Sequence, residues 1–199
     1  MNIIGVVPFK YESTRLPLKN FQKISHKEKA PNLWQATYQL LKNDNRISEI
    51  FFALDENIIT KNAVHEWGII NNVFQEEIDY PKGNTLGQKL SYFLMFLEFN
   101  NRLKGVDYVI VPQVDIWPKF SSDITDMIDV AQKTQVDYIV SCHDEKQIGA
   151  WRMIKVPLCQ EVLGQTLGFC EMGLERVDIH YQKDLEAAQF YYDNCKGEF

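Results

Sequence analysis

Short, continuously apolar runs alternate along the chain with longer stretches whose apolar residues recur at helical spacing. A continuous apolar run is typical of a strand that is covered on both faces, because a strand with one wet face alternates between apolar and polar residues. The runs that fit a covered strand are residues 3–7, 50–54, 106–111 and 136–141, with a weaker one at 151–156. This alternation predicts an α/β fold in which helices cover a mainly parallel sheet.

The helical stretches separate these runs, and the whole pattern predicts a single domain over residues 1–199. Apolar spacing indicates helices at 33–41, 59–67, 86–97, 124–131 and 183–194. In the third of them, Phe93, Met95 and Phe96 are expected in the core. Parallel sheets bind ligands beyond the carboxyl ends of their strands. We therefore expect functional residues in the loops that follow Val7, Leu54, Val111 and Ser141.

The charge and the cysteines of the chain limit which partners it can bind and in which cellular compartment it is expected. The net charge is −6, and the lysines and arginines form no dense run, which argues against nucleic acid as a partner. No apolar run approaches the ~20 residues of a membrane helix, and nothing resembles a signal peptide. The cysteines show no metal-finger spacing, as expected of reduced thiols; they are Cys142, Cys159, Cys170 and Cys195. We expect a cytoplasmic protein that contacts no membrane.

A cationic loop follows the first strand and runs from Pro8 to Asn20. Lys10, Arg15 and Lys19 lie close together in this exposed loop, beside hydroxyl and amide side chains. Triphosphates bind where cations, hydroxyls and backbone N–H groups converge on the phosphate oxygens. The alternative is a solvated surface loop whose charges cluster without a ligand. The sequence contains neither a Gly-x-Gly-x-x-Gly loop nor a nucleophile-elbow serine.

The order of residues in this loop resembles the signature Pro-Ala-Arg-x-x-Ser-x-Arg-Leu-Pro-x-Lys-Asn of a cytidylyltransferase family. Its members activate 3-deoxy-manno-octulosonate and sialic acids as CMP sugars. The matching residues are Pro8, Ser13, Arg15, Leu16, Pro17, Lys19 and Asn20. Lys10 stands where the family has arginine, which keeps the charge but lacks the bidentate fork. Glu12 replaces a usual glycine and adds a carboxylate to the loop.

The resemblance extends over most of the chain. Residues 52–58 are similar to the Thr-Asp-Asp ending of the family's second strand, and Gln113-Val114-Asp115 is similar to its Gln-Gly-Asp element. Residues 136–141 and 177–185 are similar to a later strand and to the closing Asp-Ile-Asp element. The match is weakest at 143–175, where an abbreviated segment corresponds to the part of the family that recognises the acceptor and forms the dimer.

The resemblance implies a Rossmann-like, three-layer nucleotidyltransferase fold and transfer of CMP from CTP to an acidic sugar, with release of pyrophosphate. It also implies a place in cell-surface polysaccharide biosynthesis and assembly as a homodimer. The catalytic cations that it implies are Lys19, Arg15 and Lys10. Pro8, Ser13, Asn20 and Gln113 are implied to help bind the nucleotide. Fixed cations suit this reaction because negative charge spreads over the phosphate oxygens as the α-phosphate is attacked.

Mg²⁺ is the cofactor that the resemblance implies, and oxygen ligands suit this ion. Asp115, after a buried strand, is the first candidate ligand, and its alternative role is to cap a turn or helix. Asp178 is the second candidate. His180 replaces the second acidic residue of the closing element, and imidazole suits transition metals better than Mg²⁺. Asp184 is expected to cap the last helix.

Three other functions stay open at the level of the sequence. The acceptor could be another acidic or phosphorylated molecule, such as a phosphonate. The chain could be a non-catalytic relative that binds a nucleotide, given Lys10, Glu12 and His180. It could also be a glycosyltransferase that uses a nucleotide sugar, although such enzymes usually carry an Asp-x-Asp motif and only Asp115 stands at that place.

Overall fold

The computed structural model describes residues 1–9, 13–54, 74–76, 86–144, 146–156, 167–172 and 176–194. Several predictions from the sequence concern residues outside these ranges. They are those on Lys10, Glu12, Cys159, Cys195, residues 55–58 and the helix at 59–67.

The described residues contain a seven-stranded sheet with the order β3-β2-β1-β4-β7-β6-β8. Its strands are β1 (Ile3–Phe9), β2 (Ile47–Leu54), β3 (Phe74–Glu76), β4 (Tyr108–Pro112), β6 (Tyr138–His143), β7 (Lys146–Lys155) and β8 (Leu167–Glu171). Only β7 runs antiparallel to its neighbours in this sheet, β4 and β6. The mainly parallel sheet is therefore confirmed, with strands at all four positions expected first.

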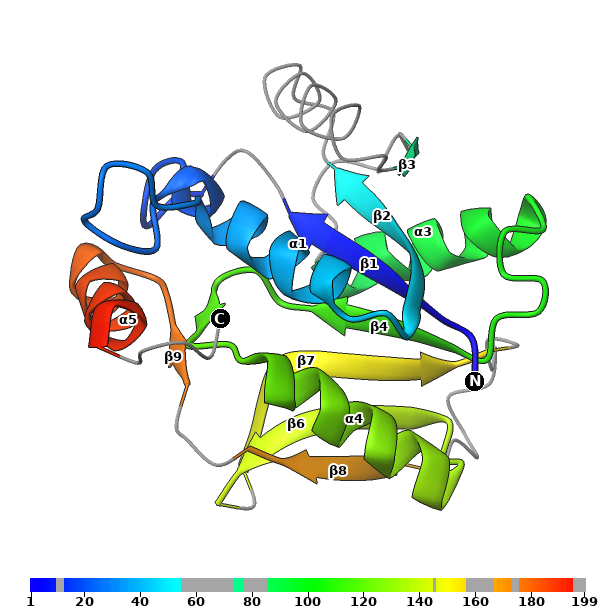
Figure 1. Ribbon diagram of the computed structural model, residues 1–199. Coiled ribbons are helices and arrows are strands. Elements are labelled where there is room, and N and C mark those ends of the chain that lie inside the picture. The colour runs from blue at the N-terminus through cyan, green and yellow to red at the C-terminus, as the bar shows by residue number, and fades with distance from the viewer. Residues whose placement is uncertain are drawn as a thin grey trace.

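Helices cover both faces of this sheet and make three layers (Figure 1). α1 (Leu33–Asn43) and α4 (Ser121–Thr134) lie on one face, and α3 (Leu86–Phe99) lies on the other. Side chains of β1 alternate between the two cores: Ile3 and Val7 join the cluster under α1 and α4, whereas Ile4 and Val6 join the cluster under α3. The strands read as continuous apolar runs because both of their sides are covered.

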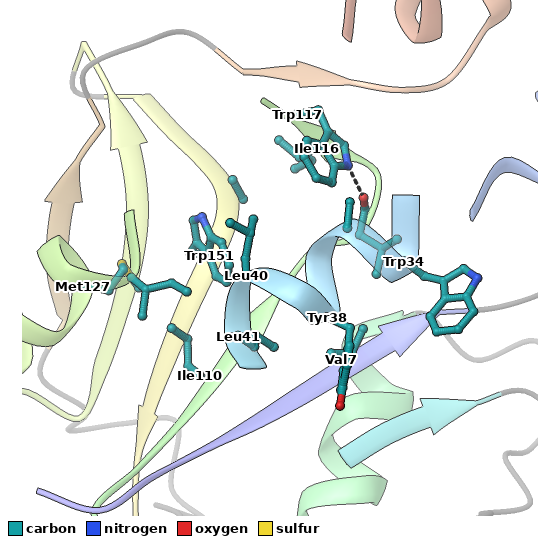
Figure 2. Packing of buried hydrophobic residues seen from close by; sticks show 14 of the residues in the cluster. Val7, Trp34, Tyr38, Leu40, Leu41, Ile110, Ile116, Trp117, Met127 and Trp151 are labelled. Carbon is teal, nitrogen blue, oxygen red and sulfur yellow. Dashed lines mark hydrogen bonds between the residues drawn. The ribbon is translucent and has the colours of Figure 1, made fainter. Parts of the chain in front are cut away.

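The larger core lies on the face of α1 and α4, and Figure 2 shows residues of several elements converging on it. α1 contributes Leu40 and Leu41, while α4 contributes Met127 and β7 contributes Trp151. On the other face, Phe93 of α3 is buried as expected, but Met95 is 57% exposed and is not a core residue. The difference arises because Met95 lies two positions from Phe93, about 200° round the helix, where the side chain points away from the sheet.

A second, two-stranded sheet stands beyond the carboxyl edge of the main sheet. It pairs β5 (Ile116–Trp117) with β9 (Val177–Asp178) in antiparallel register. β9 leads into α5 (Gln182–Asn194), the helix expected at the end of the chain. We call this pair the β5–β9 ribbon. No helix among the described residues is long and apolar enough to cross a membrane.

Candidate active site

The β5–β9 ribbon brings together two aspartates that are far apart in the sequence. Ile116 lies opposite Asp178 in the ribbon. The N–H of Ile179 donates a hydrogen bond of 2.8 Å to the backbone carbonyl of Asp115. Asp115 comes three residues after β4 ends, so the pair lies at the carboxyl edge of the sheet, where a parallel sheet binds its ligands.

Lys19 reaches the same place from the loop after β1. The loop closes in the short 3-10 helix η1 (Lys19–Phe21), preceded by Leu18 with a positive φ of 52°. The buried side chain of Leu16 anchors the loop on the core. The Lys19 ammonium makes an ion pair with the Asp115 carboxylate. Lys19 was expected on an exposed loop, and this was wrong: the residue is only 8% exposed, because the loop folds back onto Asp115.

Charges of both signs surround Asp178. Burial raises the pKa of this carboxyl, and the negative charge of Asp115 raises it further. His180, Lys19 and Arg15 act in the opposite direction and lower it. The Nε2 atom of His180 lies 3.2 Å from a carboxylate oxygen of Asp178. Five residues singled out from the sequence thus form one electrostatic cluster.

Three other residues expected at the nucleotide, Pro8, Ser13 and Asn20, have contacts of their own. Pro8 is buried near the end of β1, opposite Ala53 of β2. The Ser13 hydroxyl accepts a hydrogen bond of 3.5 Å from the N–H of Leu16 and stays within its own loop. Asn20 is buried beside Lys19 in η1. Pro8, Ser13 and Asn20 thus lie in β1, in the loop after it and in η1, and their roles at the nucleotide stay predictions.

Gln113 sits directly after β4 and has a cationic neighbour that the sequence analysis missed. Its backbone N–H bonds to the carbonyl of Ala150 at 2.9 Å, and its side-chain oxygen accepts a hydrogen bond of 3.4 Å from Arg152. Gly149 has a φ of 65° and leaves room here, since a Cβ would lie 3.2 Å from the Arg152 guanidinium. The sequence did contain an indication of this role, because Arg152 is the one charged residue among the otherwise apolar residues 151–154.

A buried polar network supports the loop behind Asp115, and the sequence analysis missed it as well. Asp123 accepts hydrogen bonds from Arg176 at 2.8 Å and from the indole of Trp151 at 2.9 Å. Burial raises the pKa of Asp123 and lowers that of Arg176, and each charge opposes the shift of the other. Lys119 lies beside this network and is fully buried. The sequence did not indicate that these three charged residues are buried, because charged residues usually lie at the surface.

His143, at the end of β6, forms a second small cluster with Asp144 and Glu171. One ligand atom from each lies within 4.8 Å of the others, which makes them the one group of three metal-capable side chains among the described residues. The Nδ1 atom of His143 is 2.8 Å from the carbonyl of Met172. Both carboxylates are well exposed. This cluster ties the β6–β7 turn to the end of β8.

No protein-family model and no curated protein sequence matches the chain. The structure of CMP:2-keto-3-deoxy-manno-octonic acid synthetase complexed with CTP is similar, with a TM-score of 0.72 and 13% identity over 97% of this chain and 99% of that chain. A cytidylyltransferase from Leptospira borgpetersenii serovar Hardjo-bovis is also similar, with a TM-score of 0.65 and 16% identity over 99% of this chain and 89% of that chain. A Bacillus anthracis structure assigned as a glucose-1-phosphate thymidylyltransferase has a TM-score of 0.68 and 14% identity over 99% of this chain and 98% of that chain.

These likenesses show that the chain has the α/β fold of nucleotidyltransferases. The neighbours include a CMP-sugar-acid synthetase, so the resemblance noted in the loop at residues 8–20 is borne out at the level of the fold.

Proposed function

We propose that this protein is a nucleotidyltransferase that passes CMP from CTP to an acidic sugar, of the 2-keto-3-deoxy class, with release of pyrophosphate. The observation that carries the proposal is the cluster of Lys19, Asp115 and Asp178 at the carboxyl edge of the sheet. The loop that delivers Lys19 has the residue order of the CMP-sugar family, and the fold supports the same activity.

The chemistry needs positive charge around the α-phosphate. A hydroxyl oxygen of the acceptor forms a bond to the α-phosphorus, while the bond from this phosphorus to the leaving pyrophosphate oxygen breaks. Negative charge grows on the bridging and leaving oxygens. Lys19 and Arg15 supply fixed cations for this charge, and Arg152 supplies another beside Gln113. The acceptor's proton passes to solvent or to a nearby base.

The two aspartates fit a divalent cation. Burial is the main cause of the raised pKa of Asp178, and repulsion from the charge of Asp115 adds to it, so a cation between the two carboxylates would relieve that repulsion. Hard carboxylate oxygens are ligands that Mg²⁺ accepts while it keeps several of its waters. Asp115 and Asp178 would hold Mg²⁺, which when bound withdraws charge from the phosphate oxygens. His180 already has its Nε2 beside Asp178, so it orients that carboxylate.

Lys19 has two competing partners in this proposal. Its ammonium pairs with Asp115 in the protein itself, so the carboxylate is neutralised and the lysine is held in place. A triphosphate offers Lys19 stronger acceptors, and charge-assisted bonds to phosphate are among the strongest that a lysine makes. We infer that Lys19 moves from Asp115 to the phosphates when the nucleotide binds. Asp115 then becomes available as a metal ligand.

The test is pyrophosphate release from each of the four nucleoside triphosphates, with Mg²⁺, across a panel of acceptors. The panel holds 2-keto-3-deoxy sugar acids, a sialic acid, sugar 1-phosphates and a phosphonate, and mass spectrometry identifies each product. We expect release only with CTP and a sugar acid. A product from a sugar 1-phosphate or a phosphonate would reassign the acceptor, and a thymidylyl product would reassign the base.

Two controls separate the competing functions. Asp115→Asn should abolish release, while Lys155→Met, which changes a lysine bonded to Gln135 far from the site, should leave it unchanged. Binding of CTP without any turnover would favour a non-catalytic relative. Hydrolysis or transfer of the sugar from a nucleotide sugar would favour a glycosyltransferase.

The homodimer and the cytoplasmic location follow from the same proposal. Cys142 and Cys170 are buried free thiols, which fits a reducing compartment. We expect light scattering coupled to gel filtration to give about twice the mass of 23.3 kDa. A monomer in that measurement would remove the dimer from the proposal and leave the chemistry intact.

A further inference from the structure

A lysine is completely buried directly behind Asp115. Lys119 lies two residues after β5 and just before α4, and none of it is exposed. Fully burying an ammonium group is costly unless nearby groups accept its hydrogen bonds. A lysine at such a position therefore indicates a specific task for its charge or its donors.

The hydrogen bonds of Lys119 end on both sides of Asp115. Its Nζ donates to the backbone carbonyl of Ile116 and, at 3.4 Å, to the carbonyl of Val114. The same ammonium lies 4.5 Å from the centre of the Trp117 ring. The indole of Trp117 also donates to the carbonyl of Val114, at 2.7 Å, which is the dashed line in Figure 2. The turn that carries Asp115 is thus wrapped around one ammonium group.

The charges that face Lys119 come from three elements. Burial lowers the pKa of Lys119 to about 7, Asp115 and Asp123 raise it, and Arg176 lowers it. The lysine therefore sits between the carboxylate proposed to hold the metal and the buried Asp123–Arg176 pair. Its charge and its donors connect the core of the molecule to the Asp115 turn.

We propose that Lys119 is a positioning residue that sets the direction of the Asp115 carboxylate by holding the two flanking carbonyls. This inference rests on the proposed function, since it assigns the purpose of the turn to metal binding. Stability alone does not account for the lysine, because a buried charge can often be replaced by an apolar side chain of similar volume without loss of stability. An apolar side chain would fill the same space, but it would leave both carbonyls without a donor.

Lys119→Met is the test, because methionine is also unbranched and carries no charge. We expect the variant to fold with a circular dichroism spectrum like that of the wild type. Its affinity for Mn²⁺ in the presence of CTP, followed by the EPR signal of free Mn²⁺, should fall about 10- to 100-fold, as is typical when a group that orients a ligand is lost. The Mg²⁺ concentration for half-maximal turnover should rise by a similar factor.

Lys155→Met is the matched control, because Lys155 likewise donates to a backbone carbonyl, that of Gln135, but lies at the other end of the sheet, opposite Tyr108 at the start of β4. Its Mn²⁺ affinity should equal that of the wild type. Hydrogen exchange adds a measurement that needs no metal: the amides of residues 114–117 should exchange faster in Lys119→Met alone.

The outcomes separate this inference from the proposed function. A wild type that binds neither CTP nor a divalent cation would remove the proposed function, and faster exchange at 114–117 would still support the role of Lys119 in holding the turn. Metal affinity and exchange within about twofold of the wild type would overturn the inference. So would a Lys119→Met protein that does not fold, since the lysine would then be structural.

Discussion

Lys19 shows how one residue can serve both the free protein and the proposed reaction. Its ammonium is paired with Asp115, which holds the lysine at the place where the phosphates are expected. The family resemblance assigned it to the nucleotide, but no sequence pattern indicated its burial or its carboxylate partner. Both depend on the fold of the loop, which brings residues 19 and 115 together over a large sequence separation.

Lys19→Ala should lower the rate of CMP transfer ~100- to 1000-fold, because loss of one fixed charge contact to a transition state typically costs about 2.7–4 kcal/mol. The variant also removes the ion-pair partner of the Asp115 carboxylate, so we expect a lower unfolding temperature when Mg²⁺ is absent. Rates are therefore compared at a temperature where circular dichroism shows the folded form. Lys23→Ala removes an exposed lysine nearby in the sequence and should keep full activity. Equal rates in both variants would exclude Lys19 from the mechanism.

The metal assignment is tested by titrating Mg²⁺, Mn²⁺ and Co²⁺ into the wild type, Asp115→Asn and His180→Asp. Asp115→Asn should lose Mg²⁺-dependent turnover, because it removes a charged oxygen ligand. His180→Asp restores the family's acidic residue and should raise turnover with Mg²⁺. A preference of the wild type for Mn²⁺ or Co²⁺ would place His180 among the ligands. Full Mg²⁺ activity in Asp115→Asn would refute the assignment of Asp115.

Lys119 also gives stability a predictable dependence on pH. Its folded-state pKa is about 7, well below the ~10.4 of an unfolded lysine. Between these values the unfolded chain binds more protons, so the free energy of unfolding rises with pH, on the order of 1 kcal/mol per pH unit. Urea unfolding at pH 7 and pH 9 should show this gain in the wild type relative to Lys119→Met. Parallel changes in the two proteins would mean that Lys119 keeps an ordinary pKa.

At the scale of elements, three helices begin in the same way. The third residue of each helix accepts a hydrogen bond from the backbone N–H of its N-cap residue: Gln35 from Asn32, Asp123 from Phe120 and Asp184 from Tyr181. This is the reciprocal half of a capping box. The expected capping role of Asp184 is confirmed, and Asp123 has the same role in α4, whose N-cap residue is Phe120.

Asp184→Ala should destabilise the protein by about 0.5–2 kcal/mol, the usual cost of losing a helix cap. The Asp184 carboxylate accepts from the N–H groups of both His180 and Tyr181, so its loss also frees the segment that carries His180. Urea unfolding measures the loss of stability, and Lys183→Ala in the same turn is the control. A destabilisation no larger than that of Lys183→Ala would show that α5 begins without help from Asp184.

The β5–β9 ribbon could not be predicted from the sequence, although the site depends on it. Its strands have two residues each, so neither offers a repeat from which a strand can be recognised. Asp115 and Asp178 were identified by their resemblance to family motifs. Such a resemblance implies a role for each residue, but it does not say that the two residues lie close together. Their proximity follows from long-range pairing, and that pairing is invisible to local patterns.

At the scale of the whole molecule, the fold was largely predictable because its strands are buried on both faces, which gives the clearest sequence pattern of any strand. The antiparallel direction of β7, by contrast, was not predicted from the sequence. Parallel neighbours need a connection of about a dozen residues or more, whereas β6 and β7 are joined through residues 144 and 145 only, so β7 must return antiparallel. As a result β7 separates β4 from β6 and places Arg152 beside Gln113.

This arrangement predicts where the nucleotide lies. The loop after β1 and the segment at 112–115 after β4 come from neighbouring parallel strands, so both rise from the same edge of the sheet. The loop after β1 carries Arg15 and Lys19, whose cations can contact the phosphates. The segment after β4 carries Gln113 and Asp115, and the amide of Gln113 can contact the base. We expect a crystal grown with CTP and Mg²⁺ to show the triphosphate between these segments.

The same binding should be visible in solution, and there it can be dissected. CTP with Mg²⁺ should slow hydrogen exchange at residues 13–20 and 112–117 and leave α4 and β8 unchanged, because only the first two segments border the expected cleft. Lys19→Ala should remove the protection at both segments, since the nucleotide bridges them, whereas Lys23→Ala should keep it. Protection of 13–20 alone would mean that the nucleotide contacts the loop without reaching Asp115. Nucleotide density on another face, with this edge of the sheet free of it, would refute the placement and with it the roles given to Lys19 and Gln113.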